Sequence, residues 1–152
     1  MTTTETTPTV VPDFGDDDTD RKICFICSKG NLDMAYPALI MANGALGEGI
    51  ETHLFFTFWG MDMINKATMD DLKFTPLGNA TKMLKQQIAD LDVPEVPEFL
   101  QMLADMGAQL WACQMSVDMM GLKQEDLFDE VIDVINVSQF MELSEGAQVI
   151  FV

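Results

Sequence analysis

The sequence predicts an α/β fold, a three-layer α/β/α sandwich with a mainly parallel sheet of about five strands. Two observations lead to this prediction. Apolar runs of strand length alternate along the chain with segments whose apolar residues recur at helical spacing. Residues 22–59 also read as a strand, a helix and a second strand, a βαβ unit whose two strands must be parallel.

The first strand is expected at residues 22–27, because an apolar run there ends at polar residues and a glycine. A helix follows from Leu32 to the glycines at 47 and 49, and the β-branched and aromatic run of residues 50–59 forms the second strand. A third strand begins near Ala108 and opens into a loop after Cys113. The remaining expected elements are short helices over 61–67 and 124–128, a loop over 69–79, helices over 80–91, 98–107 and 136–145, and strands over 130–134 and 148–152.

The length of 152 residues suits one domain. Residues 1–20 contain six acidic residues, no basic residue and little apolar surface. Such a composition cannot form a core, so a disordered acidic tail is expected in front of an α/β domain over residues 21–152. Asn136 is expected to cap the helix that follows it.

The charge and cysteine content limit the classes of partner and compartment. A formal charge of -17, from 25 acidic and 8 basic residues, argues against binding nucleic acid or an anionic membrane through a basic patch. The apolar runs are far shorter than the roughly 20 residues that span a bilayer. Three cysteines and no charged-then-apolar leader favour a cytoplasmic protein with reduced thiols.

The stretch from Leu110 to Gly121 contains the main candidate for chemistry. A short apolar run ends at Cys113, and Ser116 and Asp118 follow it. The carboxyl ends of the strands form the rim where open α/β sheets bind ligands, so a thiol at this point is placed for reaction. The alternative is a buried structural cysteine, because free cysteines are among the most buried residues.

Cys24 and Cys27 have the spacing of a redox or zinc motif. Within one strand, however, three steps of about 3.3 Å place them roughly 10 Å apart on opposite faces. That arrangement argues against a shared metal or a disulfide. Cys24 is therefore expected in the core, whereas Cys27, at the end of the strand, could reach the same rim as Cys113.

The only histidine, His53, lies inside the second expected strand, so a packed or edge histidine is favoured over a general base. A Cys-His hydrolase is therefore weakly supported. The segment after the first strand has one glycine and lacks the spacing of a dinucleotide fingerprint or a P-loop. We expect no cofactor and no metal.

Ser28, Lys29 and Gly30 offer a cation and free backbone N–H groups where the first strand gives way to a helix. If the first and third strands are neighbours, this segment lies beside Cys113 and lowers the pKa of its thiol. The alternative is that Lys29 is a solvated loop lysine.

Three blocks of sequence resemble the DsrE/DsrF-like family, in the subgroup often labelled peroxiredoxin-like. The blocks are residues 28–36, 52–60 and 112–121, and the resemblance covers roughly residues 21–152. It implies a flavodoxin-like α/β/α fold, self-association into trimers or similar homo-oligomers, and handling of sulfane sulfur on one cysteine, which maps to Cys113. Some members of the family have hydrophobic membrane segments, which this sequence does not show, and no peroxidase cysteine motif supports the peroxiredoxin label.

Three hypotheses follow, and whether the chain is an enzyme depends on which one holds. In the first, the Cys113 thiolate accepts sulfane sulfur as a persulfide and relays it between donor and acceptor proteins, which requires only a thiolate, access and an acceptor. In the second, the chain is a non-catalytic binding or assembly module in which Cys113 is merely packed. In the third, Cys113 reduces peroxide with Cys27 as the resolving thiol.

Overall fold

The computed structural model describes residues 20–74 and 80–152. The helices, the short 3₁₀ helices (η) and the strands follow one another as β1 (Lys22–Cys27), α1 (Leu32–Gly47), β2 (Glu51–Phe56), η1 (Phe58–Met63), α2 (Thr81–Asp90), α3 (Val96–Asp105), β3 (Gln109–Cys113), α4 (Gln114–Met120), η3 (Gln124–Asp126), β4 (Val131–Ile135), α5 (Val137–Leu143) and β5 (Gln148–Phe151).

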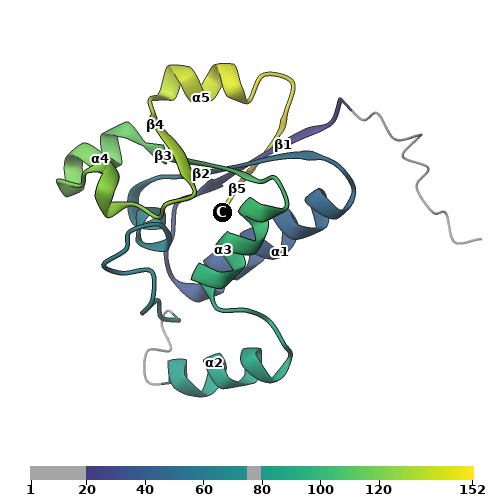
Figure 1. Cartoon of the computed structure of the whole chain (residues 1–152), viewed down its shortest axis with the longest axis vertical. Coiled ribbons are helices and arrows are strands. Elements are labelled where there is room, and N and C mark those ends of the chain that lie inside the picture. The colour runs from purple at the N-terminus through teal and green to yellow at the C-terminus, as the bar shows by residue number, and fades with distance from the viewer. Residues whose placement is uncertain (1–19, 75–79) are drawn as a thin grey trace, which may run out of the picture.

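The five strands form one sheet in the order β4-β3-β2-β1-β5, and every neighbouring pair is parallel. The steps from β1 to β4 run in one direction, whereas β5 returns to the far side of β1. Because crossovers between parallel strands are right-handed, this reversal places α5 on the opposite face from α1 and α3. Figure 1 shows α5 on one side of the sheet and α1 and α3 on the other. The predicted three-layer fold class is confirmed.

Two hydrophobic clusters join the layers. The larger one lies between the sheet and helices α1, α3 and α4, and its strand residues include Cys27, Phe56 and Ala112. The smaller one lies between the sheet and α5, and it is made of Cys24, Phe55, Cys113, Ile135 and Phe140. Since side chains alternate along a strand, neighbours in sequence belong to different clusters.

Helix α5 is the main cover of the second face of the sheet, and its start follows the expected capping pattern. The Asn136 side chain accepts a hydrogen bond from the Gln139 N–H, and the Gln139 side chain accepts one from the Asn136 N–H, both at 2.9 Å. This reciprocal capping satisfies two backbone donors at the helix start. The helix spans only seven residues, so this layer is thin.

Two expectations about strand ends are wrong. The second strand ends at Phe56 instead of continuing to Trp59, because Phe58 adopts a φ of 47°, which is not extended backbone. The short helix expected at 61–67 begins earlier, as η1. The third strand does not open into a loop after Cys113, because α4 begins at the next residue, Gln114.

The expectation that the first and third strands are neighbours is also wrong. Strand β2 lies between β1 and β3 and pairs with both. The first four strands are laid side by side in chain order, and only the last crosses back. The segment after β1 is therefore two strands away from the segment after β3.

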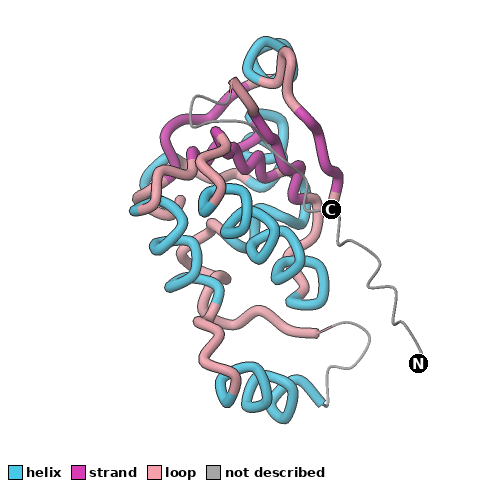
Figure 2. The backbone as a smooth tube through the Cα atoms, turned by 90° about the vertical axis from the view of Figure 1, so that its right-hand side faces the viewer, coloured by secondary structure: helices cyan, strands magenta, loops and turns pink. Residues whose placement is uncertain are grey.

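Residues 1–19 of the expected acidic tail lie outside the described residues, as do residues 75–79 of the expected loop. Figure 2 shows α2 at the bottom of the molecule, set apart from the sheet. Within the described ranges, no helix combines the length and apolar character that crossing a bilayer demands.

Candidate functional site

Cys113 is the last residue of β3 and the residue from which α4 begins. Its side chain is 4% exposed and faces the α5 side of the sheet, together with Phe55, Ile135 and Phe140. This is the carboxyl end of a central parallel strand, as the sequence predicts. The thiol therefore lies at the rim of the sheet and is shielded on one side by the smaller hydrophobic cluster.

Hydroxyl and backbone N–H groups surround the Cys113 sulfur and set the pKa of its thiol. Burial by itself raises the pKa of Cys113, but the side chains of Thr57 and Ser116 and the backbone N–H groups of Ser116 and Met115 hydrogen-bond the sulfur and lower it. The net result is a pKa of Cys113 below its ordinary value. Hydrogen bonds to a charged acceptor favour the charged form, so this arrangement stabilises the thiolate.

Ser116 is held by residues that follow β2. Its side chain is fully buried, its oxygen accepts a 2.8 Å hydrogen bond from the Phe58 N–H, and it lies 3.3 Å from the Thr57 hydroxyl oxygen. Because its oxygen accepts from Phe58, its own proton is available to the sulfur. Phe58 has a φ of 47°, which is unusual for a bulky residue and costs energy.

Thr57 is a site residue that sequence reasoning missed. The sequence predicts Thr57 to lie within the second strand, because it stands in a run of aromatic residues and threonine itself favours strands. The structure places Thr57 immediately after β2, the strand adjacent to β3. A hydroxyl residue at the end of an otherwise apolar run is the only signal that the sequence offered.

Ser28 and Gly30 contribute to packing next to the site. The Ser28 hydroxyl donates a 2.8 Å hydrogen bond to the Val152 carbonyl, so it ties the C-terminal end to β1. A Cβ at Gly30 would lie 2.6 Å from the Trp59 carbonyl oxygen. A Cβ at Gly60 would collide with the Cys27 carbonyl oxygen, so the η1 segment can lie against the end of β1 only because these two positions are glycines.

Lys29 and Asp118 are exposed. Asp118 accepts a 2.9 Å hydrogen bond from the Gln114 side chain, one turn earlier in α4. Lys29 follows β1 and is separated from the end of β3 by β2. The structure therefore brings Ser116 to Cys113 but does not bring Lys29 beside it through neighbouring strands.

Cys24 and Cys27 lie on opposite faces of the sheet, as expected for their spacing within one strand. Burial raises the pKa of Cys27 to about 12, and burial together with the nearby Glu51 carboxylate raises that of Cys24 to about 11 despite the Lys22 charge. Cys27 belongs to the α1 side and Cys113 to the α5 side, so the structure does not bring these two thiols together. All three cysteines are free thiols.

His53 is a packed histidine, as the sequence predicts. Its side chain is 1% exposed; Nε2 lies 2.6 Å from a Glu51 carboxylate oxygen, and Nδ1 accepts a 3.1 Å hydrogen bond from the Trp111 indole N–H. Both ring nitrogens are therefore occupied. Among the described residues, no group of three histidine, cysteine or acidic side chains is arranged to hold a metal.

Comparison with known proteins identifies a family and relatives of this chain. The model of the DsrE/DsrF/DrsH-like family matches residues 19–81 and 77–151. The sulfur carrier protein DsrE2 of Allochromatium vinosum is 29% identical over 137 residues, which cover 73% of this chain and 85% of that protein. The uncharacterized protein YrkE of Bacillus subtilis is 26% identical over 156 residues, a match that covers 87% of this chain and 97% of YrkE.

Solved structures share the fold. The protein of unknown function MTH1491 from Methanobacterium thermoautotrophicum superposes with a TM-score of 0.63 at 14% identity, over 88% of this chain and all of that one. The YchN protein from E. coli gives a TM-score of 0.57 at 14% identity, over 87% and 99% of the two chains. These likenesses concern the fold alone. Because the family model spans nearly all of the described sequence, the chain belongs to the DsrE/DsrF/DrsH-like family.

Proposed function

We propose that this chain is a sulfur carrier in which the Cys113 thiolate accepts sulfane sulfur as a persulfide and passes it to a thiol of a partner protein. The observation that supports this proposal most strongly is the lowered pKa of Cys113 at the rim of the sheet, where two hydroxyls and two backbone N–H groups bond the sulfur. The likeness to a protein named as a sulfur carrier points to the same role.

The proposed chemistry is two successive thiolate attacks. In the first, the Cys113 thiolate attacks the sulfane sulfur of a polysulfide; a new S–S bond forms, the donor S–S bond breaks, and the remainder of the donor leaves as a thiolate or hydrosulfide. In the second, an acceptor thiolate attacks the outer sulfur of the Cys113 persulfide and releases the Cys113 thiolate. Neither step requires a metal, an external oxidant or a general base.

The groups around the thiol suit a small donor and a docked acceptor. Cys113 is 4% exposed, so access to the sulfur is narrow. The two elements that hold it, η1 and α4, also present exposed apolar side chains, namely Phe58, Trp59, Met115 and Met119. Such residues are typical of the centre of protein interfaces, and we assign them to contact with a protein acceptor that presents its cysteine.

Mass spectrometry tests the proposal directly. After incubation with polysulfide, the intact protein should gain the mass of one or more sulfur atoms, and a reductant should reverse the gain. Cys113→Ser should lose this loading, while the matched control Cys24→Ser should retain it because Cys24 is buried with a pKa of about 11. Sulfur loading that persists in Cys113→Ser would exclude the assignment.

The low exposure of Cys113 also supports the second candidate, a non-catalytic module in which the thiol is packed. Labelling under native conditions separates the two. A small reagent such as methyl methanethiosulfonate should modify Cys113 quickly in a carrier, whereas a packed thiol should resist it until denaturant is added. Peroxide reduction with Cys27 receives no support from the geometry, because the two thiols lie on opposite faces of the sheet.

We further propose that the chain forms homo-oligomers through the thin layer of the sandwich. Helix α5 and the edge strand β5 expose apolar side chains there, with Val137 60%, Met141 63%, Val149 46% and Phe151 71% exposed. Strand β5 has no charged residue to prevent edge contacts. Sedimentation should show an oligomer for the wild-type chain and a smaller species for Phe151→Glu.

A further inference from the structure

His53 is the only histidine of the chain, and its ring lies on the α5 side of the sheet between two other side chains. The Trp111 indole N–H donates a 3.1 Å hydrogen bond to Nδ1, and Nε2 lies 2.6 Å from a Glu51 carboxylate oxygen. An indole N–H only donates, so Nδ1 carries no proton and Nε2–H donates to Glu51. The hydrogen bond between Trp111 and His53 therefore exists only while the ring is neutral.

Protonation of the His53 ring would break one of these two contacts and keep the other. A proton on Nδ1 would set the imidazolium N–H and the Trp111 indole N–H against each other, and two donors form no hydrogen bond. The contact with Glu51 would become an ion pair, which favours the charged ring. Because His53 is 1% exposed, a charged ring needs such a partner, and Glu51 provides it.

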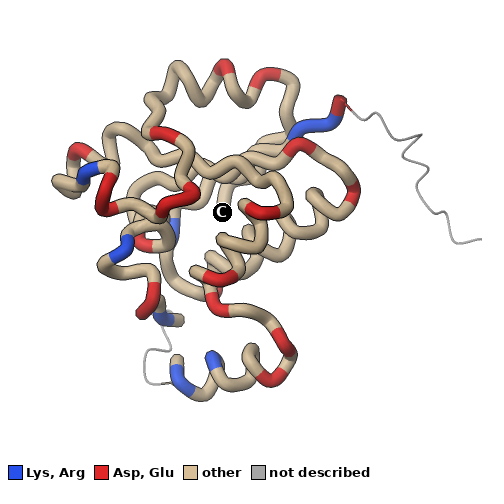
Figure 3. Tube along the Cα trace, viewed as in Figure 1, with Lys and Arg blue, Asp and Glu red and all other residues tan. Residues whose placement is uncertain are grey.

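The titratable and charged groups around His53 belong to both neighbouring strands and to the α5 layer. Besides Glu51, they are Lys22 and Cys24 of β1, Asp133 of β4, which pairs in register with Trp111, and the exposed Glu142 and Glu145 of α5 and the turn after it. Lys22 lies 4.0 Å from the Glu51 carboxylate, and Figure 3 shows the basic start of β1 beside acidic residues. Burial raises the pKa of Cys24 to about 11, so its thiol stays neutral near pH 7.

Trp111 connects His53 to the thiol site. Side chains alternate along β3, so Trp111 and Cys113 point to the same face of the sheet, and Trp111 packs against the hydrophobic cluster that contains Cys113. The half-buried indole stacks on the His53 ring, with the ring centroids 6.3 Å apart. Leu143, the last residue of α5, packs against the same cluster, and its carbonyl accepts a 3.1 Å hydrogen bond from Lys22. Release of the indole would therefore loosen the cover of Cys113.

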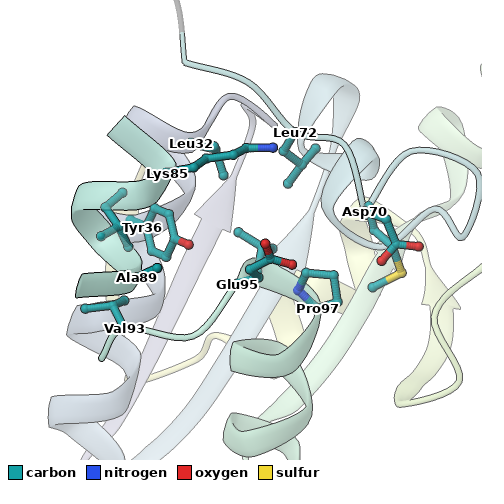
Figure 4. Close-up of a pocket in the computed structure, with 12 residues that line it drawn as sticks. Leu32, Tyr36, Asp70, Leu72, Lys85, Ala89, Val93, Glu95 and Pro97 are labelled. Atoms are coloured by element: carbon teal, nitrogen blue, oxygen red, sulfur yellow. The ribbon is translucent and has the colours of Figure 1, made fainter. Parts of the chain in front are cut away.

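The two faces of the sheet differ in how firmly they are covered. On the α1 side, the cavity between α1, α2 and α3 has a volume of only about 40 Å³, and Tyr36, Lys85 and Glu95 are among the residues around it (Figure 4). Such a space admits groups the size of water. On the other side, α5 has seven residues, of which Phe140 is the one that is buried. A single hydrogen bond beneath this thin layer therefore matters more to its opening.

We propose that Glu51, His53 and Trp111 form an acid-sensitive latch that regulates access to the Cys113 thiol. At pH 8 the latch is closed, with the neutral ring bonded to Trp111. As the pH falls through the titration of His53, the ring takes up a proton from solvent, keeps Glu51 and releases Trp111, so the α5 layer opens more often. The use of this regulation rests on the proposed function, whereas the latch itself is measured without sulfur.

Tryptophan fluorescence of the full chain tests the latch, in a Trp59→Phe background because Trp59 is the only other tryptophan. The Trp111 emission should change with one midpoint between about pH 5 and 8, the range in which histidine commonly changes charge. His53→Asn should abolish the change, because an amide oxygen replaces Nδ1 as acceptor but takes up no proton. Glu51→Gln should move the midpoint to lower pH, because the charged ring loses its partner.

Access to the thiol is measured as the rate at which methyl methanethiosulfonate modifies Cys113, located by peptide mass mapping. Ionisation of Cys113 affects the wild type and His53→Asn alike, so the ratio of their rates reports the latch. This ratio should be near one at pH 8 and rise about fivefold at pH 5, the factor that one hydrogen bond contributes to an opening equilibrium. Glu145→Gln, an exposed acid of the same layer, is the control and should behave like the wild type.

Trp111→Phe gives a second test that does not depend on the folding of His53→Asn. Without the indole N–H the latch is always open, so this variant should react about fivefold faster than the wild type at pH 8 and equally fast at pH 5. Trp111 emission that does not change with pH or that still titrates in His53→Asn, or rate ratios that are constant with pH, would overturn the latch. Absence of sulfur loading at pH 8 with the fluorescence change retained would contradict the sulfur carrier alone.

Discussion

The backbone N–H of Phe58 donates a 2.8 Å hydrogen bond to the hydroxyl oxygen of Ser116. This contact connects Phe58, whose backbone is strained, to a hydroxyl that hydrogen-bonds the Cys113 sulfur. A bulky residue with a φ of 47° persists only where its surroundings compensate for the strain. Here the compensation includes the hydrogen bond to a buried serine. The positions of β2's end and of the thiol are therefore linked through one hydroxyl group.

Removing that hydroxyl should weaken the thiolate. In Ser116→Ala, the pKa of Cys113 should rise, because a hydrogen bond to the charged sulfur is lost. A hydrogen bond to a charged group contributes about 1.5 kcal/mol or more, so alkylation of Cys113 at pH 7 should slow about tenfold. At alkaline pH the rates of the two proteins should converge. The measurement is the pH dependence of alkylation with Cys24 and Cys27 replaced by serine, and Ser144→Ala is the control.

Lys29 offers a comparison with Ser116. Since β2 separates the segment after β1 from Cys113, Lys29→Ala should change the alkylation curve less than Ser116→Ala does. A through-space charge effect would also be reduced by added salt, whereas the hydrogen bond would not. A larger shift for Lys29→Ala than for Ser116→Ala would restore the lysine as the main source of thiol activation.

Gly60→Ala should disturb the site from a distance. A Cβ there meets the Cys27 backbone, which cannot move aside without shifting β1. We expect a loss of about 3 kcal/mol in the free energy of unfolding. We also expect slower alkylation of Cys113, because a displaced η1 would move Phe58 away from the Ser116 hydroxyl that it holds. Gly44→Ala is the matched control: it lies in α1 with open space around it, and it should stabilise the protein by about 1 kcal/mol. Urea denaturation measures both, and equal effects would contradict the packing argument.

Alkaline pH should destabilise the fold through Cys27. Burial raises its pKa from 9.0 to about 12, so the folded state favours the neutral thiol. The corresponding stability is fully present below pH 9.0, the unfolded value, and is lost as pH rises toward 12. In Cys27→Ala the free energy of unfolding should fall less steeply over this range. The difference between the pH slopes of the wild type and of Cys27→Ala separates the contribution of Cys27 from the titration of tyrosines and lysines. Equal slopes in the two proteins would contradict the prediction.

The parts of the fold that could be predicted are those that depend on local patterns. Strand β1 has the predicted bounds because a continuous apolar run ends abruptly at polar residues. The cap of α5 was predicted because Asn136 has a side chain of the right length and charge distribution for that position. Opposite faces for Cys24 and Cys27 followed from the period of a strand.

The parts that failed depend on contacts between distant segments. Strand order is decided by how crossovers pack, and nothing in the residues of β1 and β3 specifies that β2 lies between them. The role of Thr57 depends on Ser116, which is 59 positions away in sequence, so a local pattern could draw attention to the hydroxyl of Thr57 but not to its partner. The candidate thiol itself was found from its place at the end of an apolar run and from a family resemblance.

Cys113 is shared by two regular elements, with no intervening loop to absorb a change in chain length. Deleting or inserting one residue in β3 would move the Cys113 side chain to the other face of the sheet, into the cluster beneath α1 where Cys27 lies and away from Phe55 and Phe140. Substitutions around Cys113 can adjust the reactivity of its thiol, but an insertion or deletion in β3 would remove the thiol from the site. Related sequences should therefore differ within β3 by substitutions only. Insertions and deletions should be confined to the connection that leads from α3 into β3.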